Sequence, residues 1–246
     1  MNEERLRRSR SFGSVAQLYD QYRPGPPPEV HHLYGDLAGK DVAELGAGTG
    51  LVARFLESQG AVVTAIEPDD DMRAVLEANS PEIVAINALA QELPFADESF
   101  DVVVASSAWH WFPQPETSIE VGRVLRDNGR LLIVGNGLDT MVEWTASIGS
   151  LRQNGTDLTD RNYVASVPKE GPFEVTNHEV VAYLWTRTVE QLVGLFNTYS
   201  ATIVQPPEVR ERLSQEVQEL LQGHVHDGVI ELPMMTTFME FRRIPR

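Results

Sequence analysis

Three alternating glycines directly after a short apolar segment constrain this 246-residue chain more than any other feature. Residues 42–50 read VAELGAGTG, and the helical pattern LVARFL follows at residues 51–56. A buried strand that enters a glycine-rich turn and then a helix is typical of α/β proteins with a nucleotide-type ligand at the turn. Glycine permits positive φ angles and lets a ligand approach the backbone without meeting a Cβ atom. The sequence therefore predicts a ligand cradle at residues 46–50.

Apolar runs and helical patterns alternate between residues 41 and 135, which predicts a parallel sheet covered by helices on both faces. We expect strands at residues 42–45, 62–66, 83–86, 100–105 and 130–134. Apolar residues at helical spacing predict three helices between them. These start at residue 51, near residue 72 and after Pro115, and the last is expected to close at Asn128 and Gly129.

The flanking regions predict an arm and an insertion. Residues 12–22 fit a helix that the prolines at residues 24–28 end, because proline removes a backbone donor. Downstream we expect a helix at residues 142–151 and then a variable loop to residue 171. A strand at 175–184 and helices at 189–199 and 208–221 follow, with Gly223 as the cap of the last helix. One or two strands are expected at 229–244. This predicts an arm (1–30), a core (31–135) and an insertion that also completes the sheet (136–246), in one continuous domain.

The composition of the chain limits the classes of ligand and partner that we expect. The formal net charge of −16 repels polyanions, so nucleic acid is not expected as a substrate, although Arg5, Arg7, Arg8 and Arg10 form either a local basic arm or, more commonly, a solvated tail. The absence of cysteine excludes disulfides and thiolate metal sites, and His31 and His32 lack a convincing set of partner ligands, so we expect no catalytic metal. No apolar run is long enough for a membrane span or a secretory signal, so a cytoplasmic protein without a membrane partner is expected.

Glu44, Gly46, Gly48 and Gly50 fill all four positions of an acid-x-Gly-x-Gly-x-Gly motif. This motif resembles the first cofactor-binding motif of class I S-adenosylmethionine-dependent methyltransferases. The dinucleotide fingerprint Gly-x-Gly-x-x-Gly requires a third glycine where this chain has Leu51, so that fingerprint fails. A carboxylate beside the turn also disfavours a pyrophosphate, whereas it favours the ammonium and sulfonium groups of S-adenosylmethionine.

A second acid, Glu67, follows Gly50 by seventeen residues at the tip of the next predicted strand. An acid at this place can accept both hydroxyls of a ribose. Asp69, Asp70 and Asp71 fit helix-start residues, since acids complement the helix dipole there. Met72 lies either against the adenine face or in the core.

Residues 87–101 resemble the adenine-side loop and fourth strand of the same family. The family's acid stands at Leu89 in this chain, which leaves the backbone groups of Ala90 and Gln91 as candidates for the adenine. The Leu-Pro-Phe segment that begins at Leu93 and the Ser-Phe-Asp segment that begins at Ser99 are intact and are expected to be structural.

Two further segments are expected beside the cofactor. After the fourth strand, Ser106 resembles a position near the methionine part, and His110 is either a general base or a pocket-lining residue. Trp109 and Trp111 either shape an apolar acceptor pocket or belong to the core. Residues 12–24 resemble the family's N-terminal arm, whose Tyr19, Tyr22 and Arg23 either close the site, with Arg23 on the cofactor's carboxylate, or only pack on the sheet.

The resemblance covers at least residues 12–134. It implies an α/β, Rossmann-like, seven-stranded and mostly parallel sheet, S-adenosylmethionine as cofactor, and methyl transfer to a small-molecule acceptor. Two alternatives remain open at this point: an NAD(P)-linked oxidoreductase and a non-catalytic binding protein on the same fold. The residues implied to contact the cofactor are Glu44, Gly46, Ala47, Gly48, Gly50, Glu67, Pro68, Met72, Ala90, Gln91, Ser106, Tyr19 and Arg23.

Overall fold

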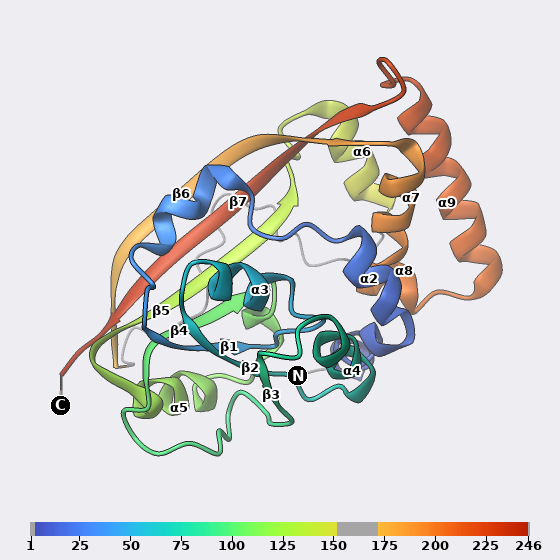
Figure 1. The fold of residues 1–246 in the computed structure, drawn as a ribbon. Helices are drawn as coiled ribbons and strands as arrows, with labels where there is room; N and C mark the ends of the chain where they lie inside the picture. The colour runs from blue at the N-terminus through green and yellow to red at the C-terminus, as the bar shows by residue number, and fades with distance from the viewer. Residues whose placement is uncertain (1–2, 152–171, 246) are drawn as a thin grey trace. The chain divides into compact units, whose positions relative to one another are not determined.

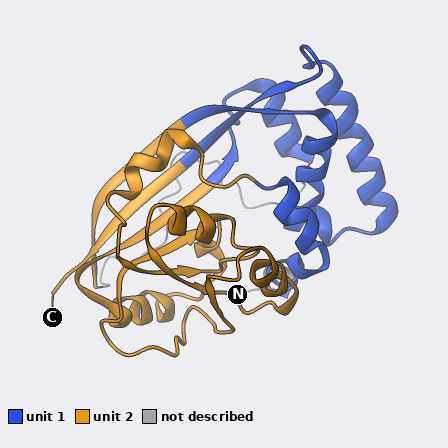
Figure 2. Ribbon diagram, in the orientation of Figure 1, with its two compact units in different colours: residues 1–23, 136–163, 182–236 blue, residues 24–135, 164–181, 237–246 orange. Residues whose placement is uncertain are grey.

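The computed structural model describes residues 3–151 and 172–245 of the chain (Figure 1). The chain forms two compact units, which Figure 2 shows in blue and orange. Unit 1 contains residues 1–23, 136–163 and 182–236, and unit 2 contains residues 24–135, 164–181 and 237–246. Each unit therefore combines three separate stretches of chain. The predicted division into an arm, a core and an insertion stays a prediction.

A seven-stranded mixed sheet with helices confirms the predicted Rossmann-like α/β fold. The first five strands, β1 to β5, pair in parallel, and β7 runs opposite to its neighbours β5 and β6 (Figure 1). The order across the sheet is β3-β2-β1-β4-β5-β7-β6, so β1 lies between β2 and β4. The strands are β1 (Asp41–Leu45), β2 (Val62–Ile66), β3 (Val84–Ile86), β4 (Phe100–Ser106), β5 (Leu125–Leu138), β6 (Phe173–Arg187) and β7 (Ile230–Arg243).

The core of unit 2 is one apolar cluster between the parallel strands and the elements that cover them. Val42 of β1 and Val102 and Val104 of β4 are fully buried, as expected for strands with helices on both faces. The same cluster contains residues of the 3-10 helix η2 (Pro28–Tyr34) and of α3 (Leu51–Ser58), and it also includes Phe238 of β7. The helices α4 (Asp70–Asn79) and α5 (Glu116–Val124) complete this unit.

The end of α5 differs from the sequence-based expectation. The helix was predicted to close at Asn128 and Gly129, but it ends at Val124, and Leu125 already pairs with Phe100 of β4. Leu125 is fully buried, so pairing with the sheet outweighs the local helical pattern. Asn128 adopts a left-handed conformation (φ 60°) inside β5, which explains why its turn signal is real but misplaced as a helix end.

Unit 1 is mainly helical. Its apolar cluster joins α7 (Val189–Asn197) to α9 (Pro207–Gln222), in which Leu213, Val217 and Leu221 are buried. Gly223 is the residue after α9, but its φ of −66° makes no use of the freedom of glycine. The other helices are α1 (Glu3–Ser9), η1 (Phe12–Val15), α2 (Ala16–Tyr22), α6 (Glu143–Leu151) and α8 (Ser200–Ile203).

The N-terminal segments of unit 1 pack against its other helices. The guanidinium of Arg8 donates to Ser200 Oγ through Nε (3.1 Å) and Nη2 (3.0 Å). A Cβ atom on Gly194 would lie 2.6 Å from the ring of Tyr22, so this glycine lets α2 lie close against α7. The predicted variable loop at residues 152–171 lies outside the described residues. Within the described ranges, no helix is both long and apolar enough to cross a bilayer.

Candidate cofactor site

The glycine turn after β1 has the conformation that its sequence predicts. Gly46, Gly48 and Gly50 have φ angles of 65°, 57° and 85°, a region that residues with a Cβ rarely adopt. The N–H groups of Gly46 and Ala47 donate to the carbonyl of Ile66 at 2.8 Å and 3.1 Å. The turn is therefore fixed on the carboxyl end of β2, and Gly50 then begins α3.

The loop after β4 packs directly on this turn. A Cβ atom on Gly46 would lie 2.8 Å from Ala108 Cβ and 3.3 Å from Phe112 Cζ. The order of the strands reverses between β1 and β4, and ligands of open α/β sheets bind outside the strand ends at such a reversal. The segments after these two strands thus form one site within unit 2.

Glu44 lies at the end of β1 and is 2% exposed. Its Oε2 atom has no hydrogen-bond partner among the described residues. Burial raises the pKa of the Glu44 carboxyl to about 8, and the nearby carboxylate of Glu67 acts in the same direction. The backbone N–H of Ala53 and the charge of Arg54 lower the pKa and only partly offset this. Glu44 is therefore a buried acid with spare acceptor capacity.

Glu67 stands at the end of β2, as predicted, and supports the turn. Its Oε2 accepts from the Gly48 N–H at 2.8 Å and its Oε1 accepts from the Asp69 N–H at 2.9 Å. Burial raises the pKa of this carboxyl, whereas the two backbone donors lower it. A carboxylate accepts roughly four hydrogen bonds, so Glu67 retains capacity for two hydroxyls. Its role as a ribose ligand stays a prediction.

The acids after Glu67 begin a helix, which confirms their predicted structural role. Asp69 is the N-cap of α4 and accepts from the N–H groups of Asp71 and Met72, each at 3.1 Å. Asp70 and Asp71 lie in the first turn, where they complement the helix dipole. Met72 is buried and Pro68 is exposed, and contacts of either with a cofactor stay predictions.

The predicted adenine-side segment is held by α5. Leu93 N–H donates to Glu120 Oε1 at 2.8 Å, and Arg123 donates to the carbonyls of Phe95 (2.7 Å) and Leu93 (3.1 Å). These bonds confirm the structural role expected for the Leu-Pro-Phe segment. Ala90 is buried and Gln91 is half-buried just before it, and their predicted contacts with the adenine are untested.

Ser106 ends β4, and the short helix η3 (Trp109–Trp111) follows it. Trp109 is 3% exposed, packs edge-on against Phe112 at 6.0 Å between ring centroids, and has an Nε1 atom without a partner among the described residues. His110 is half-buried, with its ring 4.6 Å from that of Trp111. The predicted roles of Ser106 and His110 stay predictions.

The predicted arm residues Tyr19 and Arg23 lie in unit 1. Arg23 donates to Thr198 Oγ1 through Nε (2.8 Å) and to the Thr198 carbonyl through Nη2 (2.9 Å). Its guanidinium carbon lies 5.0 Å from the ring centroid of Tyr19 and 4.3 Å from that of Tyr199. Arg23 thus ties α2 to the end of α7. Its predicted pairing with a cofactor carboxylate stays a prediction.

Glu44 Oε2, directly before the glycine turn, and Thr49 Oγ1, within it, are buried without a partner among the described residues. Tyr34 Oη and Trp109 Nε1 of unit 2 share this property, as do atoms elsewhere in the chain, such as Thr202 Oγ1 and Arg243 Nη2. Such atoms cost free energy unless a ligand or water pairs with them, so they mark functional sites. The set combines donors with an acid and fits a polar ligand that carries positive charge. The sequence analysis did not identify Thr49 or Tyr34 as site residues. Thr49 occupies a variable position of the glycine motif, and no sequence motif includes Tyr34.

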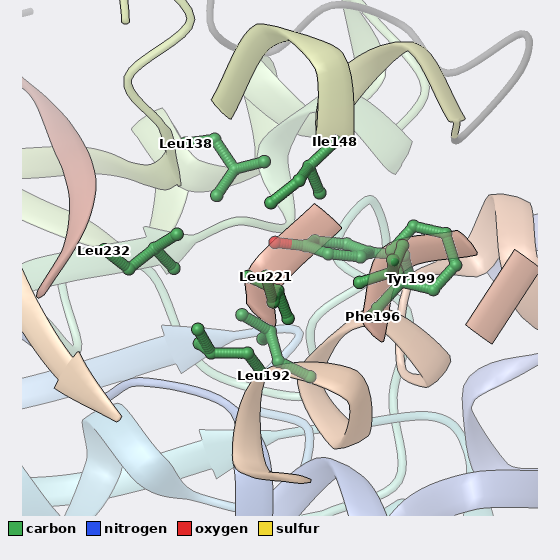
Figure 3. A pocket seen from close by; sticks show the side chains of 9 residues that line it. Leu138, Ile148, Leu192, Phe196, Tyr199, Leu221 and Leu232 are labelled. Carbon is green, nitrogen blue, oxygen red and sulfur yellow. The ribbon is translucent and has the colours of Figure 1, made fainter. Parts of the chain in front are cut away.

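A cavity in unit 1 has the opposite character. It leaves only about 10 Å³ for the centre of a water molecule. The lining is apolar except for the hydroxyl of Tyr199, which points between the lining side chains in Figure 3. Space of this size accommodates a single water at most, so the cavity is a packing gap and holds no methyl acceptor. Its lining consists of Leu138, Ile148, Leu192, Leu195, Phe196, Tyr199, Val217, Leu221 and Leu232.

Comparison with known proteins agrees with this geometry. A family model described as a methyltransferase domain matches residues 43–133, which span β1 to most of β5. An uncharacterized methyltransferase of Mycobacterium tuberculosis is 34% identical over 232 residues, which are 93% of each chain. An uncharacterized methyltransferase of Schizosaccharomyces pombe is 27% identical over 220 residues, covering 87% of this chain and 88% of that one.

Solved structures share the fold. A candidate type II methyltransferase of Anaeromyxobacter dehalogenans aligns over 92% of this chain and 100% of its own, with a TM-score of 0.65 and 21% identity. The phosphoethanolamine N-methyltransferase 2 of Haemonchus contortus, in complex with S-adenosyl-L-methionine, aligns over all of this chain and 61% of its own, with a TM-score of 0.57 and 18% identity.

The sheet order and the acid-flanked glycine turn define a methyltransferase fold of class I. With the relatives above, they show that this chain belongs to the class I S-adenosylmethionine-dependent methyltransferase family. The chain is thus a methyltransferase, as the sequence predicted, and this membership favours a methyl donor over the dinucleotide alternative.

Proposed function

We propose that the chain binds S-adenosylmethionine at the glycine turn of unit 2 and transfers its methyl group to a small-molecule acceptor. The observation that carries this proposal is the turn with left-handed Gly46, Gly48 and Gly50, beside the buried, unpartnered oxygens of Glu44 and Thr49, on a methyltransferase fold. The net charge of −16 supports a small acceptor over nucleic acid. The structural relative from Haemonchus contortus is a phosphoethanolamine N-methyltransferase, an enzyme that acts on a small molecule.

In this proposal, different residues of unit 2 contact different parts of the cofactor. Glu67 accepts the ribose hydroxyls while its bonds to Gly48 and Asp69 hold its carboxylate in place. Glu44 favours the cationic end of the cofactor, and the glycine backbone lets that end approach closely. The backbone of Ala90 and Gln91 faces the adenine, and Ser106 faces the methionine part.

When bound, S-adenosylmethionine supplies a methyl group activated by a positively charged sulfur. With the cofactor held by Glu44, Glu67 and the glycine turn, the lone pair of an acceptor would form the new bond to the methyl carbon, and the electron pair of the carbon–sulfur bond would stay with sulfur. The protein contributes position and exclusion of water, which together remove much of the barrier. The proton that the acceptor loses passes to His110 or to solvent, and this is the one step in which a side chain can act as a base.

Binding calorimetry tests the proposed cofactor. We expect micromolar or tighter binding of S-adenosylmethionine and of S-adenosylhomocysteine, and none of NADPH. Glu67→Ala should weaken this binding at least tenfold, since it removes hydrogen bonds to a charged acceptor worth about 1.5–3 kcal/mol. Glu57→Ala, which changes an exposed acid of α3, is the matched control and should bind like wild type. Absence of binding to both cofactor forms would contradict the proposal.

A screen of small acceptors with a labelled methyl donor tests the second half of the proposal. Once an acceptor is found, His110→Ala separates the two roles of this histidine. Loss of about 100-fold in kcat, with a changed pH profile, indicates a general base. A turnover within a few-fold of wild type places His110 in the lining of the site.

A further inference from the structure

The surroundings of Glu44 do not compensate a negative charge on its carboxyl group, and a neutral ligand would not compensate it either. It is 2% exposed, and one of its two oxygens has no partner among the described residues. A buried carboxylate that lacks a full set of donors is costly in its charged form. The neighbouring strands offer it no donor side chain, because Ala65 of β2 and Val104 of β4 stand beside it in register.

The titratable and charged groups that face Glu44 come from three elements. Glu67 at the end of β2 repels a charge on Glu44, and Arg54 of α3 attracts it. Tyr34 of η2 contributes a buried phenol, and burial together with Glu44 raises the pKa of that phenol far above its usual range. Arg54 is partly engaged elsewhere, since its Nη1 donates to the carbonyl of Thr49 at 2.9 Å. Glu67 differs from Glu44, because both of its oxygens accept from backbone N–H groups, which lower the pKa that burial raises.

We infer that Glu44 is protonated in the ligand-free protein and ionises only when a cationic ligand occupies the glycine turn, so that each binding event releases one proton. The inference rests on the proposed cofactor, whose ammonium and sulfonium groups provide the cation. The O–H bond of the carboxyl breaks, its electron pair stays on Glu44, and the proton passes to the buffer. Glu44 thereby selects for positive charge, and the protein avoids holding two buried carboxylates uncompensated when no ligand is bound.

Calorimetry in two buffers measures this proton directly. S-adenosylmethionine is titrated at pH 6.5 in phosphate and in an amine buffer, whose ionisation enthalpies differ. At this pH the cofactor's own α-amino group, with an ordinary pKa of about 7.7–8, is already protonated and adds little exchange. The difference between the two binding enthalpies gives the number of protons released. We expect close to one for the wild-type protein, and affinity that rises by up to about tenfold from pH 6 to pH 7.

Glu44→Gln keeps the shape of the side chain and cannot titrate. We expect it to release close to no proton and to bind with an affinity that changes little over the same pH range. Glu57→Gln, on the exposed side of α3, is the matched control and should release as many protons as wild type. The neutral thioether 5′-methylthioadenosine should bind without proton release, because it lacks the cation.

The outcomes separate the inference from the proposed function. Binding of S-adenosylmethionine without proton release in the wild-type protein overturns the inference and leaves the cofactor assignment intact. Equal proton release in Glu44→Gln also overturns it, and assigns the proton to another group. If S-adenosylmethionine fails to bind at any pH, the proposed function itself is wrong.

Discussion

The glycine turn of unit 2 and the gap in unit 1 have opposite linings. At the turn, side-chain oxygens of Glu44 and Thr49 are buried without partners among the described residues, whereas the gap is lined by aliphatic and aromatic side chains. An unpaired buried polar group costs about 1–3 kcal/mol, so the two oxygens at the glycine turn favour a bound ligand there. An apolar gap costs only lost packing contacts. The chemistry of the lining, more than the presence of a cavity, therefore distinguishes the candidate site from a packing fault.

The largest expected effect lies in unit 1. Leu221 is fully buried beside the gap, and Leu221→Ala should lower the free energy of unfolding by about 3–5 kcal/mol. Urea unfolding measures this change. Leu184→Ala, at an exposed position of the same unit, should cost under about 0.5 kcal/mol. We expect the folded Leu221→Ala protein to bind S-adenosylmethionine as wild type does. A parallel loss of affinity would show that the two kinds of buried space are not independent.

The glycine turn gives a matched pair of substitutions within unit 2. Gly46 and Gly39 have nearly equal φ angles of 65° and 68°, but only Gly46 has neighbours in the path of a Cβ atom. Gly39→Ala should cost about 1–2 kcal/mol from backbone strain alone. Gly46→Ala should cost about 1–3 kcal/mol more from crowding against Ala108, and should also abolish cofactor binding. Equal stability of the two variants in thermal unfolding would argue against the described packing of the loop after β4.

The pH dependence of the unfolding free energy tests the protonation of Glu44 in the absence of ligand. Its folded-state pKa of about 8 lies above the unfolded value, so the folded protein binds the extra proton. The contribution of Glu44 to stability is therefore complete below about pH 4.3 and is lost as the pH rises to about 8. We expect the unfolding free energy of wild type to fall, relative to Glu44→Gln, by at most about 1.4 kcal/mol per pH unit in this window. Parallel curves for the two proteins would contradict the buried, protonated state.

The smallest expected effect separates two roles for Arg23. Its contacts with Thr198, Tyr19 and Tyr199 predict that Arg23→Met lowers stability by about 1–2 kcal/mol. If these contacts are its only role, S-adenosylmethionine affinity stays within about threefold of wild type. A tenfold or greater loss, about 1.4 kcal/mol, would support pairing with the cofactor's carboxylate. Arg7→Met, at an exposed position of α1, should change neither quantity.

Local sequence rules predicted the glycine turn and the parallel strands, because Gly46, Gly48 and Gly50 require left-handed φ angles and strands buried on both faces read as apolar runs. They misplaced the end of α5, since the pairing of Leu125 with Phe100 is a contact between distant residues. They also missed Tyr34, because nothing in residues 24–34 indicates that a phenol lies near Glu44. What the sequence does not show is which segments meet in space.

The position of β7 has a consequence for how the protein is made. It is the last of the seven strands in chain order, yet it lies between β5 and β6, and its Phe238 belongs to the core of unit 2. During synthesis, β5 and β6 leave the ribosome before the strand that must separate them. Their unpaired edges then remain exposed, and exposed edges of incomplete sheets promote aggregation. Yield from the cell should thus depend on how quickly translation finishes β7.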